Sequence, residues 1–137
     1  MMNRYLYLKA FSMVEMVAVL AIMSIVTLIA IPNYQQLVKK FQYMEIIHEV
    51  IPWRIQVEMC YWHKGDFETC SMGHGGIGHF RSARAISQLE IEQGYMYVVP
   101  QKRRGLKATD TVTFKPLVVD DRIEWSHEGP AVDQGYL

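Results

Sequence analysis

The sequence FSMVEMVAVLAIMSIVTLIAI, residues 11–31, decides the fold of this chain. It contains twenty-one residues and a single charge, Glu15, near its start. As an α-helix rising ~1.5 Å per residue it would span roughly 31 Å, about the hydrocarbon thickness of a bilayer. The stretch therefore predicts a helix that crosses a membrane.

Three other readings of this stretch differ in how well they fit. A secretory signal peptide would suit Arg4, Lys9 and the small Ala30, but its apolar region normally has roughly 7–15 residues. A buried core helix fits poorly, because a chain of 137 residues offers too little protein to cover a helix on all sides. A plain single-pass anchor remains an alternative.

Glu15 is the unusual residue of the apolar stretch. A carboxylate inside lipid costs on the order of 2.5–3.5 kcal/mol at mid-membrane and less near the interface, so it usually has a partner. If the chain were cut just before Phe11, the new α-amino group would lie one helical turn from Glu15. That amine would be able to pair with the carboxylate of its own chain or of a neighbouring chain.

The residues around this acid carry a family resemblance. The sequence KAFSMVEMVAVLAIMSIVTLIAIPNYQ resembles the N-terminus of type IV pilins, in which a short basic leader and a small residue precede Phe, Glu and a long apolar helix. Pro32 and Tyr34 match a Pro-x-Tyr of that family. IPWRIQVEMCYWHKGDFETCSMGHGGIG and TFKPLVVDDRIEWS resemble later parts of enterobacterial and Pasteurella-like major pilins.

The resemblance implies how the chain is processed and divided. Residues 1–10 would be a leader, removed by prepilin peptidase between Ala10 and Phe11, and Phe11 would then be N-methylated. Family leaders end in Gly, where this chain has Ala10. Residues 11–31 would be the transmembrane and filament-core helix, and residues 32–137 a periplasmic or extracellular globular domain that includes the rest of the helix. Pro32 lies where the family's helix melts during assembly.

The resemblance also implies location and partners. The protein would sit in the bacterial inner membrane with its N-terminus in the cytoplasm, and later in an extracellular pilus. Its partners would be further copies of itself, prepilin peptidase and the inner-membrane assembly machinery. Glu15 would neutralise the amine of Phe11 on the adjacent subunit. The expected function is that of a type IV pilus subunit, with a minor pilin or type II secretion pseudopilin, or an uncleaved membrane-anchored periplasmic binding domain, as alternatives.

The expected fold is α+β, with a long N-terminal helix packed on an antiparallel sheet of about three to four strands. Residues 33–62 form the amphipathic second half of the helix, and Pro52 should bend it. Strands are expected at 95–101, 109–119 and 122–126, with a turn at Asp120 and Asp121. Residues 81–92 read as a short helix or irregular connection, and the tail 128–137 wraps the sheet edge or frays. The helix face expected on the sheet has apolar residues at steps of three and four, with His48 tucked among them: Tyr34, Leu37, Val38, Phe41, Met44, His48, Ile51, Ile55, Met59 and Trp62.

Two cysteines, Cys60 and Cys70, bracket a short loop, and at this spacing in an exported domain they favour a disulfide. Zinc is the rival reading, because structural zinc needs four N or S donors. The two cysteines and three nearby histidines offer five such donors: Cys60, Cys70, His63, His74 and His79. The irregular spacing of the histidines and the intervening glycines favour the disulfide over zinc, with free thiols as a third alternative, so no metal is expected.

The remaining motifs are few. Net charge is zero, which gives no indication of bulk nucleic-acid binding. One basic cluster lies in a loop between predicted strands and is either a solvated turn or a weak contact for DNA or another anionic surface: Lys102, Arg103, Arg104 and Lys107. No catalytic constellation or cofactor loop is present in the sequence, so the protein is expected not to be an enzyme and to carry no cofactor.

Overall fold

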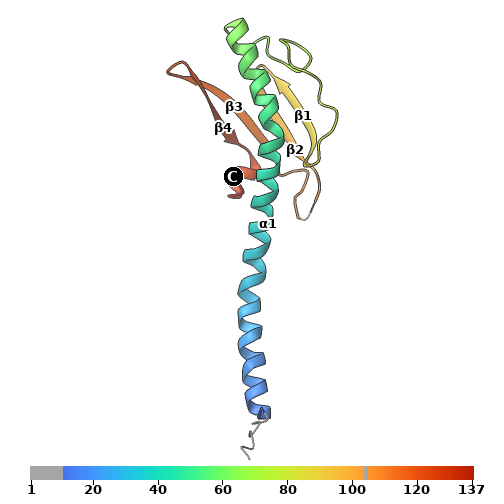
Figure 1. The fold of residues 1–137 in the computed structure, drawn as a ribbon, viewed down its shortest axis with the longest axis vertical. Helices are drawn as coiled ribbons and strands as arrows, with labels where there is room; N and C mark the ends of the chain where they lie inside the picture. The colour runs from blue at the N-terminus through green and yellow to red at the C-terminus, as the bar shows by residue number, and fades with distance from the viewer. Residues whose placement is uncertain (1–10, 104) are drawn as a thin grey trace, which may run out of the picture. The chain divides into compact units, whose positions relative to one another are not determined.

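The computed structural model describes residues 11–103 and 105–137 (Figure 1). The chain divides into two compact units, one ending at Tyr34 and one comprising Gln35–Leu137. The helix α1, Met13–Lys64, contributes to both, and each unit is described by itself.

From Met13 onward, the first unit is apolar helix. Within α1 there is a stretch long and apolar enough to cross a membrane, with a mean hydropathy of 2.6 and none of its residues buried. Its two hydroxyl side chains bond back to the helix, from Ser24 Oγ to the Leu20 carbonyl (2.5 Å) and from Thr27 Oγ1 to the Met23 carbonyl. Because these polar groups are satisfied within the helix, the segment suits a solvent that offers no hydrogen bonds.

The second unit contains a four-stranded antiparallel sheet in the order β1-β2-β3-β4. Its strands are β1 (Ile86–Glu92), β2 (Tyr95–Pro100), β3 (Val112–Val119) and β4 (Arg122–Glu128). Two-residue turns at Gln93-Gly94 and Asp120-Asp121 close the outer hairpins, and all four residues have positive φ, between 48° and 82°. Such turns match the right-handed twist of the strands that they join, and the predicted turn at Asp120 and Asp121 is confirmed.

The expectation for residues 81–92 was wrong, because most of this segment is strand β1. Its buried residues Ile86, Leu89 and Ile91 are spaced by three and then by two. The pairing with β2 is irregular between Ile86 and Gln88, where one extra residue interrupts the ladder. The bulge interrupts the alternation of buried and exposed residues, so that Ile86 and Leu89 are three residues apart, as they would be on one face of a helix.

The core lies between the sheet and the second half of α1, which crosses it in Figure 1. One face of the helix is buried there, at Tyr43, Ile46, Val50, Val57 and Cys60. The sheet side of this core supplies Leu89, Ile91, Met96, Val98, Val112 and Phe114, all at most 3% exposed. Helix and sheet thus hide one apolar face each, which is the minimum that a two-layer domain requires.

The sequence interpretation chose the wrong face of this helix. Leu37, Phe41, Met44, Ile51 and Ile55 were expected on the sheet, yet they are 40–67% exposed. His48, expected in the core, is exposed as well. Both faces of α1 carry apolar residues at steps of three and four, so periodicity alone cannot tell which of them meets the sheet. A second apolar face of the helix is therefore left uncovered within this unit.

The C-terminal segment packs against α1. Tyr136 stacks on the fully buried Tyr43 with ring centroids 5.4 Å apart, and Lys39 Nζ donates to the Tyr136 hydroxyl at 2.9 Å. The Tyr43 hydroxyl donates to the Asp110 carbonyl at 2.7 Å. Burial, and then the charge of Asp110, raises the pKa of Tyr43 well above its usual range, so the phenol stays protonated as a donor. A short helix α2, Pro130–Asp133, buries Ala131 on the way to this contact.

His127 makes the second unit sensitive to acid. Its ring meets Phe114 edge-on, with centroids 4.9 Å apart, and it shares an apolar groove with Lys40. Burial, and then the charge of Arg54, lowers the pKa of His127. The folded protein therefore favours the neutral ring, so the contribution of His127 to stability is retained above an unfolded pKa of about 6.5 and decreases as the pH falls below it.

We expect His127→Phe to flatten this pH dependence. The melting temperature of the wild-type protein in detergent should fall more steeply between neutral pH and about pH 5 than that of the variant. Phe keeps the edge-on contact with Phe114 and removes the titrating group. Equal slopes for the two proteins, measured by thermal unfolding at several pH values, would contradict this assignment.

Candidate functional site

At the start of α1, the side chain of Glu15 folds back toward Ser12, the residue just before the helix. The Ser12 carbonyl accepts the first helical hydrogen bonds, from the amides of Glu15 (3.0 Å) and Met16 (3.1 Å). The Glu15 carboxylate in turn accepts the Ser12 amide at 3.4 Å. This is one half of a capping box, in which Ser and Glu are three residues apart. The S-x-x-E spacing in the sequence signals it, and the sequence analysis missed it.

Glu15 has capacity for a second partner. Its side chain and that of Phe11 are exposed, the latter at 71%, and both are at the positive end of the helix dipole. A carboxylate offers about four acceptor positions, and the Ser12 amide occupies one of them. The site is therefore able to receive a cationic donor, such as an amine, from another molecule. Ala10, the residue on the other side of the predicted cleavage point, lies outside the described residues.

Pro32 lies inside a continuous helical segment. α1 is helical on both sides of this residue, and the same holds for Pro52. Proline has no amide hydrogen, so the carbonyl of Leu28, four residues earlier, lacks its usual helical partner. The helix is not open at Pro32 in this structure, and melting there during assembly stays a prediction.

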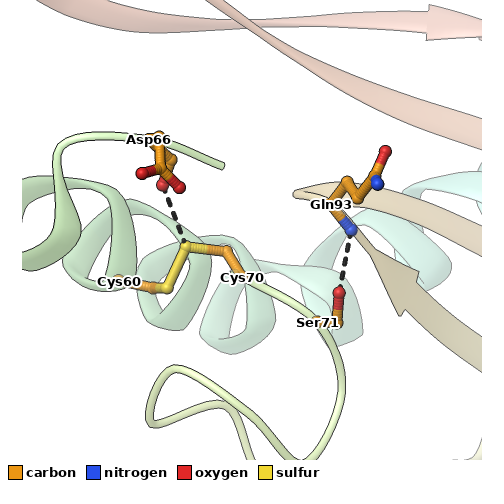
Figure 2. Close-up of a disulfide and its surroundings, with 5 residues drawn as sticks. All are labelled: Cys60, Asp66, Cys70, Ser71 and Gln93. Atoms are coloured by element: carbon orange, nitrogen blue, oxygen red, sulfur yellow. Dashed lines mark hydrogen bonds between the residues drawn. A yellow bond between two sulfur atoms is a disulfide. The ribbon is translucent and has the colours of Figure 1, made fainter. Parts of the chain in front are cut away.

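The predicted disulfide joins the end of α1 to the loop that follows it. Cys60 and Cys70 are bonded, with Cα atoms 5.9 Å apart, and both are buried. Figure 2 shows the bridge below Asp66 and, beside it, the next residue, Ser71, whose hydroxyl accepts the Gln93 amide at 3.0 Å. Because Gln93 belongs to the turn between β1 and β2, the bridged loop is tied to the sheet as well as to the helix.

Two polar side chains of α1 hold the remainder of this loop. The Glu49 carboxylate accepts the amides of Arg84 and Ala85 at 3.0 and 2.9 Å, and the Gln56 side chain accepts the Gly78 amide at 3.0 Å. Backbone donors outside helices and strands need such partners when they are removed from water. The loop from Gly65 to Ala85 is therefore anchored along the helix at several points.

The two cysteines are bonded to each other, so neither has a thiolate that could bind zinc. Among the residues that the structure describes, no group of three His, Cys, Asp or Glu side chains is arranged to hold a metal. His79 lies against Gly73, where an added Cβ would be 2.7 Å from its Nε2.

The basic cluster lies in the loop between β2 and β3. Lys102 and Lys107 are exposed, whereas Arg103 is half-buried and donates to the Arg84 carbonyl at 3.2 Å. Arg104 lies outside the described residues. The structure thus presents two freely exposed cations of this cluster to solvent, and a contact with DNA or another anionic surface stays a prediction.

The comparison with solved structures identifies the fold. The fold is that of the type IV pilins: the solution NMR structure of the major type IV pilin PpdD from enterohemorrhagic Escherichia coli matches with a TM-score of 0.54. It has 20% sequence identity, and the match covers 66% of this chain and 68% of that chain. The expected α+β fold, a long helix packed on a small antiparallel sheet, is confirmed.

A curated relative agrees with that class. The chain is homologous to prepilin peptidase-dependent protein D of Escherichia coli (strain K12), with 28% identity over 94 residues. The match covers 69% of this chain and spans 64% of the length of the relative. No protein-family model matches the chain. The chain is thus similar in fold to a major type IV pilin and in sequence to a prepilin peptidase-dependent protein.

Proposed function

We propose that this chain is a subunit of a type IV pilus, held in the inner membrane and then assembled into a filament through its N-terminal helix. The observation that carries the proposal is the start of α1, where one exposed acid precedes a wholly exposed apolar helix. Such a helix needs lipid or other apolar helices around it, because the described residues of the chain leave its apolar side chains exposed.

The proposed assembly step depends on leader removal. Prepilin peptidase cuts between Ala10 and Phe11, and the new amine of Phe11, then methylated, pairs with Glu15 of the adjacent subunit. A lone charge buried among apolar helices is costly, so this pairing selects the correct axial position of the incoming subunit. Pro32 marks the place where the helix opens as the subunits pack.

Intact-mass analysis of protein purified from cells that contain prepilin peptidase tests this proposal directly. The expected mass is that of residues 11–137 plus one methyl group. The full mass, with Met1 still attached, would contradict the proposal and favour an uncleaved anchored domain. Ala10→Gly, which restores the family residue, is the matched control and should be processed at least as completely.

A minor pilin or pseudopilin would pass the same test. Electron microscopy of cells expressing the chain from its own promoter separates these roles. Abundant filaments that a specific antibody labels along their whole length support a major subunit. Labelling confined to occasional positions supports a minor one.

A further inference from the structure

Cations gather at the end of the second unit at which α1 enters it. Lys39 and Lys40 lie on α1, and the loop between β2 and β3 lies beside this turn of the helix (Figure 1). The loop backbone at Gly105 is close to Lys39, since an added Cβ there would be 3.4 Å from the lysine Cε. We call the cations of this end the basic patch: Lys39, Lys40, Lys102, Arg103 and Lys107.

Hydrogen bonds and burial hold the loop against α1. The Tyr43 hydroxyl donates to the Asp110 carbonyl at 2.7 Å, and the Asp110 carboxylate accepts the Lys107 amide at 3.0 Å. Leu106, which lies between the loop cations in the sequence, is 4% exposed and belongs to the core. The loop is therefore fixed to the turn of α1 that follows its two lysines, and the cations of the loop and of the helix form one surface.

Three of the five cations of the basic patch are exposed. These are Lys40, Lys102 and Lys107, whereas Lys39 donates to the Tyr136 hydroxyl and Arg103 donates to a loop carbonyl. Ammonium groups form strong, charge-assisted hydrogen bonds with phosphate oxygens. Three of them on one surface therefore suit a partner that presents several phosphate groups side by side.

Acidic side chains near the basic patch offset little of its charge. Asp110 is 5% exposed, and both of its carboxylate oxygens accept hydrogen bonds within the domain. Glu45 is half-buried and lines a small pocket with Arg103. The C-terminal segment carries one exposed acidic side chain, Asp133. This end of the unit therefore has three exposed cations against one exposed acid.

The chain keeps the basic patch close to the membrane that residues 11–31 are expected to span. Lys39 and Lys40 follow Ile31 by eight and nine residues, and the segment between them is helical. That length of helix rises about 12 Å, of which the headgroup layer of a bilayer takes up roughly 5–7 Å. The patch therefore begins within about 8 Å of the headgroups, the distance over which charges interact at physiological salt.

We propose that the basic patch binds the anionic phospholipid headgroups of the bilayer that holds the chain before assembly. The lysine ammonium groups donate to phosphate oxygens, and each cation near an anionic surface contributes about a fivefold preference for it. The inference rests on the membrane stage of the proposed function and adds a lipid preference to it. Because the chain is anchored in the bilayer, the headgroups are present at a high effective concentration, whereas DNA has to arrive from solution.

Hydrogen–deuterium exchange of the full-length chain in lipid nanodiscs tests the proposal. The discs contain either phosphatidylcholine alone or phosphatidylcholine with phosphatidylglycerol, and mass spectrometry follows peptides from residues 101–110. We expect exchange in these peptides to be at least about fivefold slower in the anionic discs, and about 0.5 M salt should remove the difference. Equal exchange in the two kinds of disc would overturn the proposal.

A charge variant separates binding from a general effect of the negative surface. In the triple variant Lys40→Gln, Lys102→Gln and Lys107→Gln, the slowing should fall below about twofold. Equal slowing in this variant and in the wild type would show that the surface potential alone slows exchange nearby, and would contradict the proposal. Lys39 and Arg103 are left unchanged because they form hydrogen bonds within the domain.

The matched control removes three exposed cations outside the basic patch, by Lys64→Gln, Arg81→Gln and Arg122→Gln. This variant changes the net charge by the same amount and should keep the full slowing in the anionic discs. Loss of the slowing would show that net charge rather than the patch determines the effect, and the proposal would be wrong. Thermal unfolding in detergent checks that both triple variants are folded.

A short DNA duplex, added at the same phosphate concentration to discs of phosphatidylcholine alone, tests the other anionic partner. It should slow exchange in residues 101–110 less than phosphatidylglycerol does, and equal or greater slowing by DNA would overturn the lipid assignment. A chain that inserts into the discs without responding to phosphatidylglycerol contradicts the patch and leaves the pilus proposal intact. A chain that fails to insert contradicts both.

Discussion

Glu15→Val is expected to leave the protein processed and in the membrane but to remove filament assembly almost completely. Without the carboxylate, the Phe11 amine of a neighbouring subunit would be buried among apolar helices with no partner. Leaving one member of a buried ion pair alone costs about 3–5 kcal/mol, which corresponds to at least about a hundredfold loss of docking. Counting filaments sheared from equal numbers of cells measures the effect.

Glu15 also caps its own helix, so a control must separate the two roles. Glu15→Gln keeps the side-chain length and an oxygen that accepts the Ser12 amide, and it removes the charge. If charge pairing drives docking, Gln should fail to assemble almost as completely as Val. If helix capping is the essential role, Gln should assemble and Val should not. Normal filaments from both variants would exclude this residue from assembly.

The second large effect is expected from the double variant Cys60→Ser and Cys70→Ser. Opening a loop of this size should lower the free energy of unfolding by roughly 2–4 kcal/mol. Both sulfur positions are buried, so the two hydroxyls add a smaller cost of their own. The measurement is urea unfolding of the purified protein in detergent, followed by Trp fluorescence. Trp53 packs edge-on against Phe80 in the loop that follows the bridge, which gives a reporter of that loop's packing on α1.

Reduction provides the matched control for the disulfide. The wild-type protein treated with dithiothreitol should lose about as much stability as the double variant, and the double variant should not respond. If reduction leaves the wild-type unfolding midpoint unchanged, the bridge contributes little to stability. Single Cys→Ser variants are unsuitable, because each leaves a free thiol that is able to form bonds between chains.

The sequence predicted the features that local chemistry determines. Length and apolar composition identify residues 11–31 without knowledge of the rest of the chain. Two close cysteines predict their own bridge, and Asp120 and Asp121 between apolar runs predict a hairpin turn. These features need only a few neighbouring residues, and all of them are present in the structure.

The features that depend on packing could not be predicted. α1 has two apolar faces. The side from which β1–β4 approach decides which face meets the sheet, and the sequence of the helix alone does not contain that information. The bulge next to Ile86 gave a strand the spacing of a helix. At the candidate site, the acid was predicted but its bond to Ser12 was not, because the S-x-x-E capping pattern overlaps the start of the apolar stretch.

The bridge between Cys60 and Cys70 bears on the order of events in the proposed export of the chain. Thiols stay reduced in the cytoplasm and pair in oxidising compartments, so in the export that we propose the disulfide at the far end of α1 forms only after translocation. Once formed, the disulfide opposes unravelling of the exported part and makes its return across the bilayer costly. Disulfide formation would then make the orientation of each newly inserted chain hard to reverse.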